Sequence, residues 1–287
     1  MSSPVAKTIE TLVDDVYGLF DPAKTHTPDE ENLENFAQKL KEILRLRLSA
    51  RESLSNPLRF SSLGKPDRQL WYMAKKAPQE DLTAKTYFKF LYGDVIEQLL
   101  LFLVKEAGHT VEMEQAEVEV DGVKGHIDAV IDGVLVDVKS ASPMGYTKFV
   151  KQTVTENDVF GYAQQLAGYA QVVTPGERAA WFAMDKSSGS LCVSPLSTSI
   201  IKDYPVDKRI AHLKEVIASD TPPPRCYPDE EDGKSGNRKL GTGCSYCPFK
   251  HVCWQGLRTF AYSNGPRFLT TVAKLPDVPE VTVPEIT

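Results

Sequence analysis

Two aspartates and a lysine lie close together near the middle of the chain, at Asp128, Asp137 and Lys139. The dipeptide Asp132-Gly133 between the aspartates is typical of a two-residue hairpin turn. Antiparallel pairing about that turn places Asp128 directly opposite Asp137. Because side chains alternate along a strand, Lys139 shares one face with both acids, and the other face is apolar. The sequence therefore predicts a hairpin with a carboxylate pair and an amine on one face.

This carboxylate pair predicts a metal site. Like charges directly opposed on two strands repel each other unless a cation lies between them. Oxygen ligands favour Mg²⁺ or Mn²⁺, and the expected ligands are Asp128, Asp137, the main-chain carbonyl of Val138, and Glu97 from a preceding helix. Lys139 would orient or deprotonate a metal-bound water, or stabilise charge on the phosphate. The pattern indicates phosphodiester hydrolysis, although the acids could form only the solvent face of an amphipathic hairpin.

Several helices and strands must position these side chains. A strongly apolar helix from about Thr83 to Ala107 carries Glu97, and we expect it to be largely buried. Hairpin dipeptides at Asp121-Gly122 and Asp132-Gly133 then predict a three-stranded meander. Further elements follow: a helix over about 158–173, strands over 179–185 and 191–196, and a helix over 206–219. This order indicates an α/β fold of α+β character with a mixed sheet.

The N-terminal region carries helical and basic features. Thr27-Pro28-Asp29-Glu30 has the pattern of a capping box with proline at the first helical position, and apolar residues follow at helical spacing. Basic residues then alternate with aromatics, as in a DNA contact or a solvated loop face. Because the chain has a net charge of −6, any DNA contact must be local. The candidate phosphate contacts are Arg59, Arg68, Lys148 and Lys151.

Four of the five cysteines lie near the C-terminus, at Cys226, Cys244, Cys247 and Cys253. No signal peptide is evident, and no apolar stretch approaches the ~18 residues of a membrane span, so we expect a cytoplasmic chain without a membrane partner. Cysteines that crowd together in such a protein indicate metal ligands rather than disulfides. Four thiolates suit a structural Zn²⁺ ion and an iron–sulfur cluster equally well.

The acid–acid–lysine pattern resembles that of a known nuclease family. Asp128 followed by Asp137-Val138-Lys139, after a helical Glu97, is similar to the PD-(D/E)xK core, with Ile127 where a proline is usual. Many RecB-like members have a metal-binding histidine at the position of Glu97. Gln165 and Tyr169, in YAQQLAGYA, resemble the QxxxY helix of RecB-like nucleases. The resemblance implies that these two residues support the water, the lysine or the DNA.

The cysteine spacing carries a second resemblance. Cys244, Cys247 and Cys253 are spaced like the C-terminal trio of AddB and of CRISPR-associated RecB-like exonucleases, which bind a 4Fe-4S cluster. In those proteins the fourth cysteine precedes the nuclease core, whereas residues 1–191 contain no cysteine here. The expected fourth ligand is Cys226, with His251 as a substitute. The resemblance favours the cluster, and Zn²⁺ stays the alternative.

These observations predict a chain with four parts. A helical N-terminal region (1–80) precedes a restriction-endonuclease-like PD-(D/E)xK core (81–220), a four-cysteine metal-binding region (221–265) and an extended tail (266–287). The predicted activity is that of an Mg²⁺- or Mn²⁺-dependent DNA exonuclease, acting on single strands or duplex ends in recombination, replication or DNA processing. Proteins of those pathways are the expected partners besides DNA, and the sequence indicates no oligomeric state.

The chain looks most like small phage-encoded members of this family, because it has no glycine-rich Walker sequence of a helicase. Two other functions stay open. One is a DNA-binding or assembly module that does not cut. The other is a structure-specific or sequence-specific endonuclease, although no region dedicated to reading bases is apparent.

Overall fold

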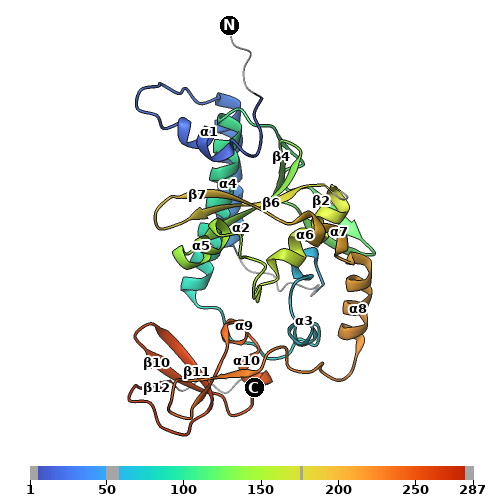
Figure 1. Cartoon of the computed structure of the whole chain (residues 1–287), viewed down its shortest axis with the longest axis vertical. Coiled ribbons are helices and arrows are strands. Elements are labelled where there is room, and N and C mark those ends of the chain that lie inside the picture. Colours follow the sequence, from blue (N-terminus) through green and yellow to red (C-terminus); the bar gives the residue numbers. More distant parts are fainter. Residues whose placement is uncertain (1–5, 50–57, 175–176, 282–287) are drawn as a thin grey trace.

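The structure is a computed structural model that describes residues 6–49, 58–174 and 177–281. A five-stranded sheet forms the centre of the upper half of the molecule in Figure 1. Its order is β1-β4-β5-β6-β7, with β5 and β6 parallel and the other pairs antiparallel. The sheet is therefore mixed, as the sequence predicts. Its strands are β1 (Val111–Glu112), β4 (Ala129–Ile131), β5 (Val134–Ala141), β6 (Ala179–Asp185) and β7 (Leu191–Pro195).

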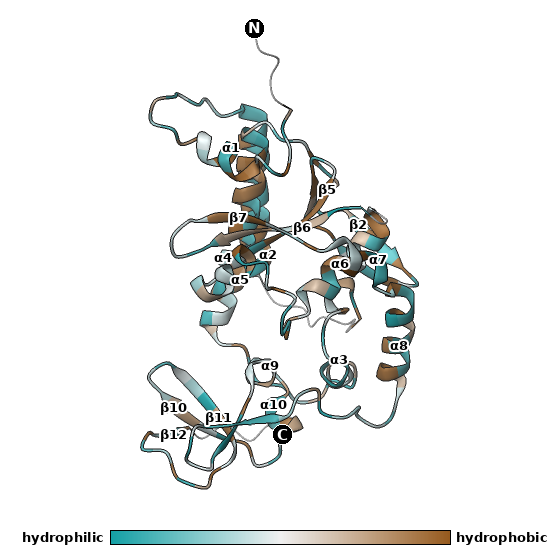
Figure 2. Ribbon diagram, in the orientation of Figure 1, coloured by the Kyte–Doolittle hydropathy of each residue, from teal (hydrophilic) through white to brown (hydrophobic). Residues whose placement is uncertain are grey.

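Helices cover both faces of this sheet, which explains why its central strands are almost wholly apolar. Helices α1 (Leu12–Gly18) and α4 (Ala84–Glu106) pack on one face, where Leu100 and Leu101 meet Val136 and Phe182. The opposite face is covered by α5 (Pro143–Val150), α6 (Tyr162–Val173), α7 (Thr198–Asp203) and α8 (Val206–Ala218), together with the short helix η1 (Phe60–Ser62). Figure 2 shows hydrophobic stretches on strands of the sheet and on α4.

Helix α2 (Glu30–Leu48) lies along α4, and Phe36 stacks on Phe102 with 4.9 Å between the ring centres. The predicted capping box is wrong in detail. The N-cap is Asp29, whose side chain accepts a hydrogen bond from the main-chain N–H of Asn32, and Thr27 lies outside the helix. An aspartate caps a helix at least as well as a threonine does, which explains the shift of two residues.

Helix α4 is only partly buried, contrary to the prediction. Its C-terminal half packs on the sheet, whereas Phe88, Phe90 and Tyr92 in its N-terminal half are exposed. Thr83 is the N-cap of this helix, since its side chain accepts a hydrogen bond from the N–H of Thr86. None of the helices in the described ranges combines the length and hydropathy that a bilayer crossing requires.

The predicted three-stranded meander is wrong. Strands β2 (Glu117–Val120) and β3 (Val123–His126) form a separate two-stranded sheet, and β4 pairs with β1 and β5 instead. The chain leaves the ladder at Ile127 and Asp128, between β3 and β4. His126 is exposed at the end of β3. Each hairpin dipeptide fixes one pair of strands, but it does not join one pair to the next.

A second five-stranded sheet lies at the C-terminal end, in the order β12-β10-β11-β9-β8 (Figure 1). It includes residues 265–271 and 280–281, so this part of the predicted extended tail forms strands. The loop of the β10–β11 hairpin is Ser263-Asn264, since Tyr262 pairs with Gly265. The strands are β8 (Asp229–Glu231), β9 (Arg238–Leu240), β10 (Arg258–Tyr262), β11 (Gly265–Thr271) and β12 (Glu280–Val281).

Three short helices lie between the two sheets: α3 (Asp67–Ala74), α9 (Thr242–Ser245) and α10 (Lys250–Cys253) (Figure 1). They connect the C-terminal region to the rest of the molecule through a few polar contacts. The N–H of Glu80 donates to the carbonyl of Pro248 at 2.9 Å, and the buried ammonium of Lys250 pairs with the carboxylate of Glu80. The indole N–H of Trp71 donates to the carbonyl of Ser219 at 2.8 Å.

Candidate active site

The β4–β5 hairpin has the predicted register. Ala129 pairs with Val136 and Ile131 with Val134, around Asp132-Gly133, whose positive φ angles of 48° and 77° suit the tight turn. The ladder ends at Ala129, one residue after Asp128. The carboxylate of Asp128 bends toward β5, where its Oδ2 accepts a hydrogen bond of 2.7 Å from the main-chain N–H of Val138.

Asp137 and Lys139 share one face of β5, as predicted. The ammonium of Lys139 lies 2.5 Å from Oδ2 of Asp137, and the carboxylate itself is almost fully buried. Ile127 departs from the predicted face, because it packs with Val130 and Leu135 rather than with Ala129. The regular alternation of strand side chains stops where the chain leaves the ladder.

Glu97 reaches this hairpin from α4. The side-chain amide of Gln115 donates a hydrogen bond of 2.7 Å to its Oε1. Gln115 also donates its main-chain N–H to the carbonyl of Asp128 at 3.1 Å, so one residue connects both acids. Gln115 is not predictable from the sequence, since no spacing rule relates the loop before β2 to a helix.

The electrostatics show how close the acids are. Burial and the charge of Asp128 raise the pKa of Glu97 to about 8, and burial and the charge of Asp137 raise the pKa of Asp128 to about 7. Burial alone would lower the pKa of Lys139, but the charges of Asp137 and Asp128 outweigh it and raise that pKa. Carboxyl groups with such raised pKa values repel one another across a desolvated site.

The donor set suits a hard divalent cation, which prefers carboxylate and carbonyl oxygens and would relieve the repulsion. Because the N–H of Val138 points to Asp128, the carbonyl of the same residue faces that edge of β5 too. Within the described part of the chain, no three His, Cys, Asp or Glu side chains are arranged to hold an ion. In this structure Asp137 is turned to Lys139, and Asp128 to an N–H donor.

Helix α6 brings its aromatic face to these residues. The ring centre of Tyr162 lies 5.5 Å from the ammonium of Lys139. Gln165 follows one turn later and is half-buried, and Tyr169 is buried against Phe60, with ring centres 5.1 Å apart. Burial and the charge of Asp137 raise the pKa of the Tyr169 phenol. Tyr162 is not among the predicted residues, although its spacing of three before Gln165 places it on the same helix face.

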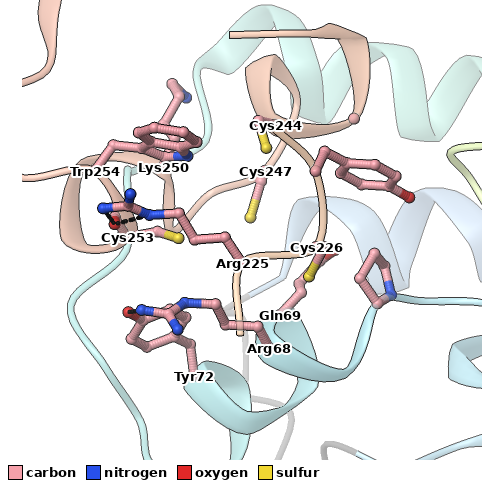
Figure 3. A pocket seen from close by; sticks show the side chains of 13 residues that line it. Arg68, Gln69, Tyr72, Arg225, Cys226, Cys244, Cys247, Lys250, Cys253 and Trp254 are labelled. Carbon is pink, nitrogen blue, oxygen red and sulfur yellow. Dashed lines mark hydrogen bonds between the residues drawn. The ribbon is translucent and has the colours of Figure 1, made fainter. Parts of the chain in front are cut away.

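The four C-terminal cysteines line one pocket between α3 and the C-terminal region, as Figure 3 shows. Each of the four is a free cysteine and not part of a disulfide. Burial raises the pKa of Cys247 to about 11, despite a hydrogen bond from the main chain of Phe249. Such a thiol ionises at neutral pH only when a metal or a cation stabilises the thiolate.

The pocket suits a metal group whose several sulfur ligands accept hydrogen bonds. Trp254 and Arg68 both line it, with Trp254 interacting with the thiol of Cys244 and Arg68 with that of Cys253. Thiolates bound to a metal accept such hydrogen bonds. Cys226, Cys244, Cys247 and Cys253 would hold the group, with His251 close by on α10.

The candidate phosphate contacts lie in three places. Arg59 is exposed just before η1, and Lys148 and Lys151 are exposed at the end of α5, which directly follows the catalytic strand β5. Arg68 lies in the cysteine pocket instead. Its guanidinium donates to the carbonyl of Pro223 and, at 3.1 Å, to the hydroxyl of Tyr72. The side chain of Arg68 therefore binds groups of the cysteine pocket and is not placed to contact a phosphate beside Asp128 and Asp137.

The raised pKa values predict how stability depends on pH. In the unfolded chain, Glu97 and Asp128 would lose their protons near pH 4. In the folded chain, Glu97 keeps its proton to about pH 8 and Asp128 to about pH 7. Between these values the folded state binds more protons, so its free energy of unfolding falls as pH rises. We expect the melting temperature of the metal-free chain to fall between about pH 5 and pH 8.5, as measured by calorimetry.

Mn²⁺ should raise the melting temperature more at pH 8.5 than at pH 5.5, because a cation binds only the ionised carboxyl groups. Glu97→Gln and Asp128→Asn are the matched control variants, since each removes one of these titrations. Both should flatten the pH dependence and reduce the effect of Mn²⁺. An Mn²⁺ effect that is the same at both pH values would contradict this account of the site.

Comparisons with known proteins identify the family. The model of the PD-(D/E)XK nuclease superfamily matches residues 59–254, which include all of the site on β4, β5, α4 and α6. The crystal structure of SSO0001 is a similar solved structure, with 15% sequence identity and a TM-score of 0.38, over 78% of this chain and 96% of that one. No curated protein sequence matches the chain. Given the extent of the family match, the chain belongs to the PD-(D/E)XK nuclease superfamily.

Proposed function

We propose that the chain is a DNA exonuclease of the RecB-like type that depends on Mg²⁺ or Mn²⁺. The observation that carries the proposal is the convergence of Glu97, Asp128, Asp137 and Lys139 at the end of one hairpin, inside the residues that match the nuclease family. The charges of all four side chains act on one another there. A solvent face of an amphipathic hairpin would not have a buried aspartate such as Asp137.

Each residue has a distinct part in the proposed reaction. Glu97, Asp128, Asp137 and the carbonyl of Val138 would hold the cation, which supplies a Lewis acid and lowers the pKa of the attacking water. Lys139, held by Asp137 and the ring of Tyr162, keeps its proton and stabilises the charge that develops on the phosphate. The raised pKa of Lys139 favours charge stabilisation over proton abstraction as the role of this residue.

Helix α6 supports the RecB-like part of the proposal. Gln165 and Tyr169 face the same side as Tyr162, toward β5, and we assign Gln165 to contact with water or DNA. Tyr169 is buried, so its part is to position the hairpin. A Cβ atom at Gly125 would collide with the hydroxyl of Tyr169, so β3 packs closely on this helix.

We propose that the cysteine pocket holds a 4Fe-4S cluster, with a structural Zn²⁺ ion as the alternative. Cys226, Cys244, Cys247 and Cys253 line this one pocket, and the spacing of the last three resembles that of cluster-binding relatives. Sulfur atoms of a cluster would also accept hydrogen bonds from Trp254 and Arg68. We propose a structural role for it.

The remaining parts of the proposal rest on the sequence. The division of the chain into a helical N-terminal region, a nuclease core and a four-cysteine region, a cytoplasmic location and a phage-type origin are consistent with its motifs, whereas the described part of the predicted tail contributes strands to the C-terminal sheet. Recombination or replication proteins are the proposed partners besides DNA. Lys148 and Lys151, exposed beside the catalytic strand, and Arg59 are the proposed phosphate contacts.

A digestion assay tests the function. The purified chain should shorten a 5′- or 3′-labelled linear DNA in Mn²⁺ or Mg²⁺ and leave it intact in EDTA. An exonuclease should spare a closed circular single strand, whereas an endonuclease should cut it. DNA binding without cleavage of any of these substrates would instead support a non-cleaving DNA-binding module.

A further inference from the structure

A row of aromatic rings leads from the cysteine region to Lys139. Tyr246 follows α9, between Cys244 and Cys247, and its ring centre lies 5.8 Å from that of Phe160. Phe160 lies 5.7 Å from Tyr162, with the two ring planes inclined by 28°. Tyr162 in turn lies 5.5 Å from the ammonium of Lys139. We call Tyr246, Phe160 and Tyr162 the aromatic row.

The row is built from separate parts of the chain that are held in place. Phe160 and Tyr162 flank Gly161, the left-handed N-cap of α6, whose main chain packs against Gly64 so closely that neither position has room for a Cβ atom. Tyr246 comes from the cysteine region, about 80 residues later. The loop before α6 and the cysteine region therefore present their rings together, next to the proposed site.

Core packing does not explain the outer rings. Tyr246 is 74% exposed and Phe160 is 48% exposed, whereas Tyr162 is half-buried over Lys139. Large apolar rings exposed side by side indicate a surface that binds a partner. Because the row ends at a residue of the proposed active site, the partner should be the substrate.

Charge beside the row indicates the chemistry of this substrate. Lys65 directly follows Gly64 and lies close enough to Arg59 for the two positive charges to repel each other. Arg59 is exposed, whereas Lys65 is partly buried and its charge also interacts with the thiol of Cys247. Two adjacent cations suit a phosphate group, and aromatic faces suit nucleobases, which is the combination found in proteins that bind single-stranded DNA.

We propose that an unpaired DNA strand reaches the active site along this row, with bases stacked on Tyr246 and Phe160 and phosphates toward Arg59 and Lys65. This inference rests on the proposed nuclease function and deepens it. Bases within a duplex already stack on one another, so their faces are not free for the rings. The row thus selects a single strand, or a duplex end that has been unpaired.

Binding of a single-stranded oligonucleotide with 2-aminopurine near its end tests the proposal. The full chain carries Asp137→Asn, so that cleavage does not interfere. Tyr246→Ala and Phe160→Ala should each weaken binding about tenfold, as expected when one stacked base loses its partner. Fluorescence of the 2-aminopurine should be quenched by the parent chain and restored by these variants, whereas Tyr246→Phe and Phe160→Tyr should keep both affinity and quenching.

Phe20→Ala is the matched control, because Phe20 is 67% exposed and follows α1, at the opposite end of the molecule from α9 in Figure 1. It should leave binding unchanged. Phe160→Leu, which keeps an apolar side chain, should still lose quenching while circular dichroism shows a folded chain. Unchanged affinity in both alanine variants, or an equal loss for fully paired DNA, would overturn the proposal. If the wild-type chain cuts DNA although binding gives either of these two results, the proposed nuclease function stands and only the role of the aromatic row is wrong.

Discussion

Replacing Asp137 by alanine should abolish DNA cleavage, with a fall of at least about a thousandfold in the rate. Asp137 is the buried member of the carboxylate pair, and it holds the ammonium of Lys139 at 2.5 Å. The substitution therefore removes a proposed cation ligand and releases the lysine at once. Lys139→Ala should have a similar effect, because no other ammonium group among the described residues contacts Asp137. Single-turnover rates on labelled DNA at saturating Mn²⁺ measure both.

The comparison needs a control for folding, since a buried charge pair is being broken. Asp137→Asn keeps the shape of the side chain, so it should stay folded by circular dichroism while cleavage is lost. Lys124→Ala is a matched control for Lys139→Ala. Lys124 is also a strand lysine that pairs with an acid, Glu117, but it lies on β3 and is exposed. Cleavage that persists in a folded Asp137→Asn chain would remove the basis of the proposed function.

The register of the catalytic hairpin could be predicted because a two-residue turn determines it locally. Once Asp132-Gly133 is the loop, the pairing of Ala129 with Val136 follows from strand geometry. The hydrogen bond from Val138 to Asp128 does not follow, because Asp128 lies just beyond the ladder. The prediction therefore placed the acids together but missed how they are held.

Contacts between separate elements were not predictable from spacing. Gln115 on a loop holds Glu97 on a helix, and Tyr162 at the start of α6 lies beside Lys139 on β5. The predicted three-stranded meander was wrong for the same reason. Whether β3 continues into the sheet of β4 depends on where Ile127 is buried, and that depends on α6 and η1 packing on the other face.

The C-terminal region shows the opposite case, in which a local signal was present but was not used. Asn264-Gly265 is a hairpin dipeptide in sequence, although the observed loop is Ser263-Asn264, one residue earlier, and the prolines that follow favour an extended tail in a sequence-based prediction. In the structure Ala261 pairs with Pro266, and Arg258 forms an ion pair with Glu280 on the edge strand β12. Proline has no N–H to donate to a strand ladder. Pro266 is tolerated because it lies beside the start of β11, before the pairing with β9 begins at Leu269.

Replacing Cys247 by alanine should remove the metal group and loosen the C-terminal region. Cys247 is a half-buried cysteine of the pocket, and burial raises the pKa of its thiol to about 11, so the free thiol has no means of ionising there at neutral pH without a metal. Anaerobically purified wild type should be brown, with about four irons per chain, and the variant should be colourless. Loss of several kcal/mol of metal-binding energy should lower the melting temperature by about 10 °C or more.

Cys192→Ala is the matched control, because Cys192 lies on β7 in the main sheet, where it packs against the core and far along the chain from the pocket. It should keep colour, iron and melting temperature within a few degrees of the wild type. One zinc per colourless wild-type chain would exclude the cluster and keep the metal site. Equal melting temperatures for Cys247→Ala and Cys192→Ala would exclude a stabilising metal altogether. A metal that joins the C-terminal region to the rest of the molecule should affect the melting temperature, because the other contacts there, such as the pairing of Lys250 with Glu80, are few.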